Sequence, residues 1–142
     1  MSIVGLHHVL IAAPSGCEAQ ARRFFGDLLG LTEVEKPEPL RRRGGVWYCL
    51  GEQQLHIGVE EPFSPARKSH PALSVGPGGI DALAERLAVA GAMVLWDDAL
   101  PGARRFFSED PWGNRIEFVA GRKESSDLGT AALRRRRSRR SR

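Results

Sequence analysis

The 142-residue chain contains no long hydrophobic run and only two cysteines. A membrane-spanning helix needs about 20 consecutive apolar residues, and no stretch of this sequence approaches that length. The first residues carry neither a basic region nor a long apolar segment, so we expect no signal peptide and, by default, a cytoplasmic protein. Cys17 and Cys49 form no disulfide framework and lack the spacing of a thiolate metal site, so we expect two reduced thiols.

Acidic residues are scarce at the C-terminal end of the chain. Residues 121–142 hold nine arginines and lysines against two acidic residues, a net charge of +7, so the rest of the chain carries −3 of the total of +4. This basic tail lacks a hydrophobic period, and we expect it to be disordered. An arginine-rich run can bind nucleic acid through phosphate charge, with strong salt dependence. Because a charge run has no specificity of its own, we favour a solvated terminus and do not expect nucleic acid as a partner.

Residues 110–118 predict a turn that is followed at once by a strand. Pro111 presets φ for the second position of a turn. In the strand, Ile116 and Phe118 lie on one face, whereas Glu117 lies on the other. A carboxylate within an apolar strand is costly unless it is paired, hydrogen-bonded or bound to a metal. The position of Glu117 therefore raises the question of which other residues share its face.

The hydrophobic periodicity predicts the same order of elements twice. In the first half a strand at 6–13 precedes an amphipathic helix at 18–29 and strands at 31–34, 46–50 and 54–59. In the second half a strand at 70–75 precedes a helix at 80–90 and strands at 92–96, 104–108 and 115–119. We therefore predict an α+β fold with two tandem βαβββ modules, module one at 3–60 and module two at 69–120, in one domain over residues 1–120.

Four potential metal ligands occupy equivalent places in the two halves. His8 and His70 lie on the first strands, and His56 and Glu117 lie on the last strands. The interval from His8 to His56 is 48 positions, and the interval from His70 to Glu117 is 47. All four residues occupy the strand face opposite the aliphatic side chains. If the two sheets face each other across a pseudo-twofold axis, these four side chains can converge in one cavity.

Three imidazoles and a carboxylate suit a divalent Zn, Ni, Fe, Co or Mn ion, and no cysteine joins them to make a soft thiolate site. A single strand histidine is more often a hydrogen-bonded structural residue, and Glu117 alone could pair with Arg105 or Arg115. Four residues with matched spacing on matched faces favour metal binding. His7 lies on the opposite face, and we assign it a structural role. Either Arg104 or Arg105 could reach the cavity to hold an anionic substrate, or face solvent.

Several segments resemble the vicinal oxygen chelate superfamily, which contains glyoxalase I, bleomycin resistance proteins and extradiol dioxygenases. The resemblance covers residues 3 to about 120 and is carried by 8–11, 24–31, 55–57, 70–72 and above all by Asp110-Pro111-Trp112-Gly113-Asn114-Arg115-Ile116-Glu117. It implies paired βαβββ modules that form an open, U-shaped barrel around a divalent metal in a central cavity. His8, His56, His70 and Glu117 stand where the family's metal ligands stand. The resemblance also implies a homodimer, in which modules of different subunits often build one site.

The activity that the resemblance implies is metal-dependent lyase, isomerase or dioxygenase chemistry on a small molecule that chelates the metal through two adjacent oxygens. Glu117 is then a ligand or a catalytic base. Glyoxalase I usually carries a carboxylate where His56 stands, so one candidate base of that enzyme is missing here. Two alternatives stay open. One is a non-catalytic protein that binds a small molecule or an antibiotic, as bleomycin resistance proteins do, and the other is a nucleic-acid-associated protein that uses the basic tail.

Overall fold

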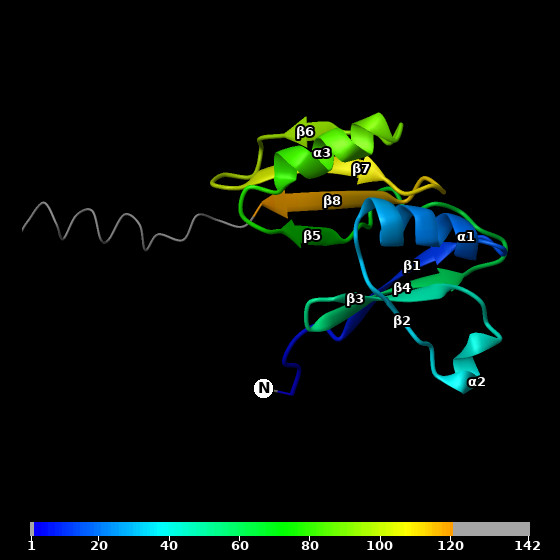
Figure 1. The fold of residues 1–142 in the computed structure, drawn as a ribbon. Helices are drawn as coiled ribbons and strands as arrows, with labels where there is room; N and C mark the ends of the chain where they lie inside the picture. The colour runs from blue at the N-terminus through cyan, green and yellow to red at the C-terminus, as the bar shows by residue number, and fades with distance from the viewer. Residues whose placement is uncertain (1, 121–142) are drawn as a thin grey trace, which may run out of the picture.

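The computed structural model describes residues 2–120, which form two four-stranded sheets (Figure 1). The first sheet has the order β1-β4-β3-β2 and consists of β1 (His8–Ala13), β2 (Glu33–Val34), β3 (Val46–Leu50) and β4 (Gln53–Val59). The second has the order β5-β8-β7-β6 and consists of β5 (Ala72–Val75), β6 (Leu95–Asp97), β7 (Arg104–Glu109) and β8 (Arg115–Ala120). In each sheet the first strand pairs with the last in parallel, and the other pairs are antiparallel. The predicted α+β class and the two βαβββ modules are confirmed, and the two sheets do not close into a barrel. The predicted basic tail lies outside the described residues.

The helices depart from the prediction in detail. The helix expected at 18–29 begins as α1 (Glu18–Ala21) and continues as the π-helix η1 (Arg22–Leu28), in which the Leu29 N–H donates to the Phe24 carbonyl five residues back. A short helix, α2 (Glu38–Arg41), lies inside the segment expected to be a loop. The third helix, α3 (Ile80–Val89), lies where the sequence predicts it. No helix within residues 2–120 combines the length and apolarity that crossing a membrane requires.

Four strands, β1, β2, β5 and β6, begin later than expected, and the reason is identifiable for the last two. The strand predicted from residue 70 begins at Ala72, because Pro71 has no N–H to donate to a neighbouring strand. The strand predicted from residue 92 begins at Leu95, because the Ala92 N–H still donates to the Leu87 carbonyl and closes the end of α3.

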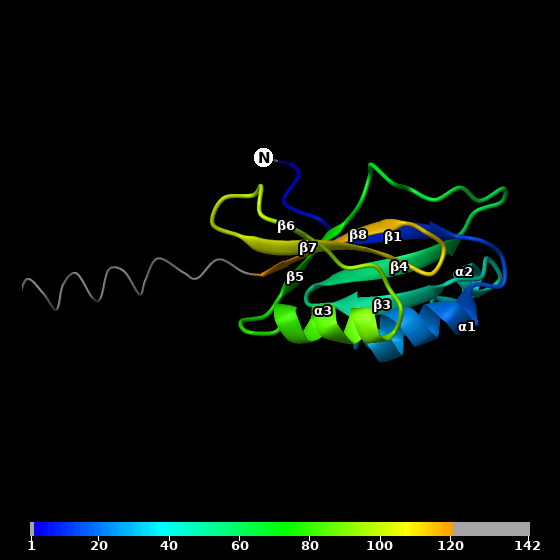
Figure 2. The same cartoon turned by 90° about the horizontal axis from the view of Figure 1, so that it is seen from above.

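One hydrophobic core lies between the helices and one face of both sheets. Figure 2 shows α1 and α3 on the same side of the strands. Side chains from both modules are fully buried in this core, among them Phe25, Ile57, Leu87 and Phe106. The face of each sheet that points away from the helices, here called the open face, carries His8, His56 and Glu117, whereas His70 lies in the segment before β5.

The turn at residues 110–114 fastens the second module to the first. The Asn114 side chain donates from Nδ2 to the Ala12 carbonyl of β1 over 2.8 Å, and its Oδ1 accepts from the Ala66 N–H over 2.9 Å. The Asp110 carboxylate accepts from Asn114 Nδ2 and from the backbone N–H groups of Trp112 and Asn114, over 2.7 to 3.0 Å. Asp110 and Asn114 are both buried, so each of these bonds is made without competition from solvent.

We expect Asn114→Ala to lower the free energy of unfolding by about 2–4 kcal/mol, because it leaves the Ala66 N–H, the Ala12 carbonyl and part of the Asp110 carboxylate without partners. Urea unfolding with a common m-value measures the change. Gln20→Ala is the matched control, because it removes the 3.1 Å bond from Trp112 Nε1, which also joins the modules but is exposed. We expect the control to cost less than about 1 kcal/mol, and equal costs for the two variants would show that the buried turn has no special importance.

Candidate functional site

His56 lies between two other rings on the open face of the first sheet. Its ring is parallel to that of Trp47 at 3.8 Å and is stacked on that of His8 at 4.3 Å. Its Nε2 lies 2.9 Å from Gln54 Oε1, so Nε2–H donates and Nδ1 keeps the lone pair. Burial, followed by the neighbouring His8, lowers the pKa of His56 to about 4. The imidazole is therefore neutral at neutral pH.

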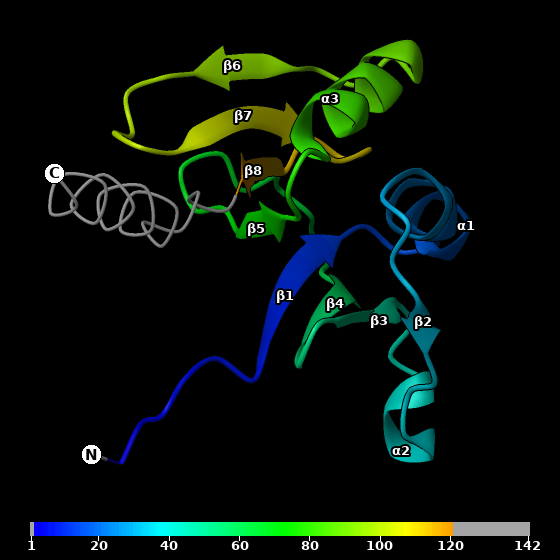
Figure 3. The ribbon, with the colours of Figure 1, turned by 60° about the vertical axis from the view of Figure 1, so that its left-hand side comes forward.

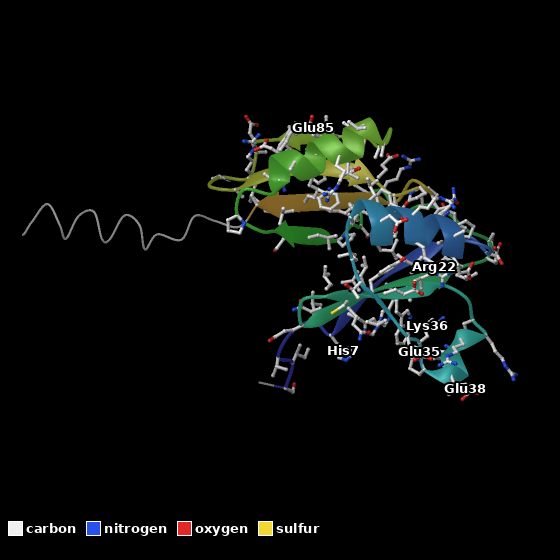
Figure 4. The ribbon with its side chains drawn as sticks, viewed as in Figure 1. His7, Arg22, Glu35, Lys36, Glu38 and Glu85 are labelled. Atoms are coloured by element: carbon white, nitrogen blue, oxygen red, sulfur yellow. The ribbon has the colours of Figure 1, made fainter. Side chains whose placement is uncertain are left out.

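His8 is exposed on the same open face, at the start of β1. Its Nδ1 lies 2.9 Å from Nδ1 of His7, so one ring donates to the other. His7 is also exposed, and Figure 4 shows it at the end of the first module away from α2, around which Glu35, Lys36 and Glu38 lie. His7 therefore does not pack into the core but belongs to the surroundings of His8.

Glu117 is buried on the open face of the second sheet and is ion-paired with Arg105. The Nη1 atom of Arg105 donates to Glu117 Oε1 over 2.5 Å, while its Nε and Nη2 donate to Asp97 Oδ1 over 3.0 and 2.9 Å. The Ala99 N–H, followed by the Arg105 guanidinium, lowers the pKa of Asp97. Of the two arginines considered from the sequence, Arg105 reaches the open face, whereas Arg104 is exposed and pairs with Asp81 of α3. The negative charge of Glu117 is thus compensated by a guanidinium that Asp97 holds in place.

His70 lies in the segment before β5 and is exposed. Its Nδ1 lies 2.8 Å from the Lys68 carbonyl oxygen, so Nδ1–H donates and Nε2 keeps a lone pair. The ring stands edge-on to Phe107, with the centroids 5.5 Å apart. This orientation matches the usual arrangement of a metal-binding histidine, in which a carbonyl fixes the ring nitrogen that does not bind the metal.

The four predicted ligands form two half-sites that do not meet within one chain. The first half-site consists of His8 and His56, and the second consists of His70 and Glu117. Within residues 2–120, no group of three or more histidine, cysteine, aspartate or glutamate side chains could hold a metal ion. His8 and His70 line one cavity of about 800 Å³, but His56 and Glu117 do not line it. The convergence expected for facing sheets is therefore absent from the single chain, because the modules share a core on their helix sides and leave the opposite faces open (Figure 3).

Comparison with solved structures identifies the family. A glyoxalase family protein from Bacillus anthracis is 46% identical to this chain and superposes with a TM-score of 0.80, over 85% of this chain and 98% of that one. The chain belongs to the glyoxalase family. The fosfomycin resistance protein FosX from Listeria monocytogenes has the same fold at 15% identity, with a TM-score of 0.70 over 90% of this chain and 98% of that one. Lactoylglutathione lyase from Agrobacterium tumefaciens is 18% identical, with a TM-score of 0.66 over 86% and 97%. These proteins are members of the vicinal oxygen chelate superfamily, as the sequence resemblance predicts. Neither a protein-family model nor a curated protein sequence matches the chain.

The structure adds neighbours of the site in this glyoxalase family chain that sequence reasoning did not assign. Trp47 and Gln54 hold His56, Asp97 holds Arg105, and Phe107 contacts His70. The sequence carries a partial signal for three of them. Trp47 and His56 are direct partners of adjacent strands, Phe107 is the partner of Glu117, and Asp97 is the partner of Arg105, so each pair shares one face of its sheet. That signal becomes readable only when the strand register is known.

We expect the stability of the metal-free protein to fall in mild acid because of His56. The folded-state pKa is about 4, whereas an unfolded histidine titrates near 6.5. Between these values the unfolded chain binds the extra proton, so the free energy of unfolding decreases as the pH falls, by about 2 kcal/mol from pH 7 to pH 5.

The measurement is urea unfolding of wild type and His56→Gln across this pH range. The variant has no proton to take up at this position, and all other titrating groups are common to both proteins. Between pH 7 and pH 5 we therefore expect its free energy of unfolding to fall by about 2 kcal/mol less than that of the wild type. The same pH dependence of the free energy of unfolding in both proteins would show that the pKa of His56 is not lowered by folding.

Proposed function

We propose that this chain is a divalent-metal-dependent enzyme of the vicinal oxygen chelate type, whose complete site forms in a homodimer between module one of one protomer and module two of its partner. The observation that carries the proposal is the division of the donor side chains into two half-sites on open sheet faces. Each half-site by itself has too few ligands for a closed transition-metal site, which usually needs at least three protein donors.

The donor chemistry fits a metal best for three of the four residues. His70 offers a lone pair on Nε2, because Lys68 fixes the proton on Nδ1. His8 is exposed, and Glu117 uses Oε1 for Arg105, while its Oε2 makes no hydrogen bond within residues 2–120. His56 fits least, because Trp47 and His8 cover its two ring faces and Gln54 takes its Nε2 proton. We therefore assign the metal to His8, His70 and Glu117, and we assign His56 the role of holding the His8 ring.

The open faces also favour a dimer. Leu10 is 57% exposed on the open face of β1, and Leu95 is 54% exposed on the open face of β6. Exposed apolar side chains beside polar functional groups are typical of surfaces that another protein covers. Twofold symmetry would place the same pair of contacts twice, so one dimer would carry two equivalent sites.

The small substrate is expected to offer two adjacent oxygens to the metal, which supplies Lewis-acid stabilisation of negative charge on those oxygens when it is bound. Glu117 is the residue that can accept a proton from the substrate through a carboxylate oxygen. Arg105 fixes the orientation of the Glu117 carboxylate, and Asp97 keeps Arg105 in place. These ion pairs give the base a defined position on β8.

A specific observation favours the alternative, a protein that binds a small molecule without catalysis. The Arg105 guanidinium compensates the negative charge of Glu117, and a carboxylate whose charge is compensated attracts a metal cation less strongly. The partly buried Trp47 ring, stacked on His56, offers a flat apolar surface instead. This alternative predicts ligand binding that survives removal of the metal.

A complementation experiment tests the dimeric metal site. Wild type purified without a histidine tag should hold about one equivalent of metal per chain, and His8→Ala and Glu117→Ala should each lose it. When the two variants are dissociated, mixed and reassociated, half of the dimers should combine one chain of each kind. Each mixed dimer has one intact and one doubly altered site, so metal content should return to about a quarter of the wild-type value. Elemental analysis measures the metal, and Glu85→Ala, on the outer side of α3 (Figure 4), is the control that should keep it.

The outcomes separate the possibilities. Metal in the wild type without recovery on mixing would place the whole site within one chain and contradict the dimeric arrangement. No metal in the wild type, even after reconstitution with zinc, nickel or iron, would contradict the metal-dependent enzyme and leave the binding protein as the better interpretation.

A further inference from the structure

Arg115 forms no ion pair with any carboxylate of residues 2–120. The six ion pairs among these residues involve other side chains. Glu109 stands directly opposite Arg115 on β7, but its carboxylate lies 3.7 Å from Arg67. Arg105 also lies against Phe107, but its guanidinium donates to Asp97 and Glu117. Of the two guanidinium groups beside Phe107, only that of Arg115 is therefore without an acidic partner in the described part of the chain.

Arg115 is held in one place. Its Cζ atom lies 4.1 Å from the centroid of the Phe107 ring, which is a cation–π contact. Its backbone N–H donates to the Ala66 carbonyl over 2.9 Å, and the neighbouring Asn114 is fixed by the buried turn. The side chain is partly buried rather than extended into solvent. A guanidinium fixed in this way loses less conformational entropy when it forms a new hydrogen bond.

Arg115 also faces the cavity that contains the exposed histidines of both half-sites. It lines the same 800 Å³ cavity as His8 and His70. The Phe107 ring, on which Arg115 stacks, is in edge contact with His70. A cavity of this size suits a small molecule. Arg115 and the ring of His70 therefore present a guanidinium and an imidazole to one space.

We propose that Arg115 binds an anionic group, a carboxylate or a phosphate, of the small molecule that occupies this cavity. The inference rests on the proposed function, because it takes the cavity to hold the substrate. The planar guanidinium offers two parallel N–H donors, which match the oxygen atoms of a carboxylate or a phosphate. The proposed role of Arg115 limits the substrate class to acids. Their anionic group would lie beside Arg115, and their two adjacent oxygens would lie toward His70.

The test uses metal-free protein, so that it does not depend on the metal. Inorganic phosphate and acetate are titrated separately into isotope-labelled protein, and the backbone amide signals are followed by NMR. We expect saturable shifts of the signals of residues around the cavity, Arg115, Ser69 and His70 above all. Tighter binding of phosphate than of acetate would assign a dianionic group to the substrate, and the reverse would assign a carboxylate.

The variants isolate the guanidinium. Arg115→Gln should weaken binding of the preferred anion by about tenfold or more, because it removes a charged hydrogen bond, whereas Arg115→Lys should weaken it less. Arg104→Gln is the matched control, because Arg104 is exposed and pairs with Asp81 on the other side of the sheet, and its affinity should equal that of the wild type.

Two results would overturn the proposal: an absence of saturable shifts near the cavity in the wild type, or equal affinity in wild type and Arg115→Gln. The wild-type shifts decide the first point even if a variant folds poorly. Metal content of the same variants separates this inference from the proposed function. Loss of anion binding with unchanged metal content supports Arg115, whereas a metal-free wild type that still binds the anion contradicts only the metal-dependent enzyme.

Discussion

The hydrogen bonds of Asn114 are the constraint on which the arrangement of the two modules depends. One buried side chain contacts β1 of the first module through Ala12, the connecting segment through Ala66, and its own turn through Asp110. An amide has both donors and acceptors, so it can satisfy a carbonyl, a carboxylate and an N–H at once. An apolar or purely acidic side chain here would leave buried groups without partners. The turn therefore acts as a joint between sheets that have no strands in common.

This joint has a consequence for the site. It brings the modules together on their helix sides, where Phe25, Ile57, Leu87 and Phe106 are fully buried, and it leaves both opposite faces uncovered. Within residues 2–120 the four donor side chains consequently do not gather into one metal site, although His8 and His70 line the same cavity. In the dimer that we propose, a second copy of the chain supplies the ligands that one chain does not bring together.

The open face of the second sheet is organised by charge. Arg105 pairs with both the buried Glu117 and Asp97, so these three groups form one connected set of ion pairs. Arg115 lies outside this set and is held by an aromatic ring instead of a carboxylate. Arg105 therefore positions Glu117, whereas the guanidinium of Arg115 can donate hydrogen bonds to a ligand. The two arginines take different roles because Asp97 and Glu117 accept hydrogen bonds from Arg105, whereas Glu109, opposite Arg115, pairs with Arg67 instead.

Much of the fold was predictable from local pattern. Alternation along the strands and the repeat of strand, helix and three strands identified the two modules, since apolar side chains must reach one face whatever the tertiary arrangement. Gly113 adopts the positive φ that its turn demands, at 90°. The π-helical segment and the delayed start at Ala72 were not predicted, because they depend on hydrogen bonds to particular neighbours.

For the candidate site, the sequence alone predicted the donor types, three imidazoles and one carboxylate, and it placed His8, His56 and Glu117 on the strand faces opposite the aliphatic residues, whereas His70 lies before β5. Successive side chains of a strand point to opposite faces of the sheet, so the face of each residue follows from its position along its own strand. Only the tertiary structure decided which of these groups meet, because meeting depends on how two sheets are oriented by a buried joint far away in sequence. It stacked His56 between Trp47 and His8, paired Glu117 with Arg105, and kept the four donors of residues 2–120 from gathering into one metal site. Side-chain pairing across strands and between modules is not encoded in spacing, and it is what sets the chemistry that each group can perform.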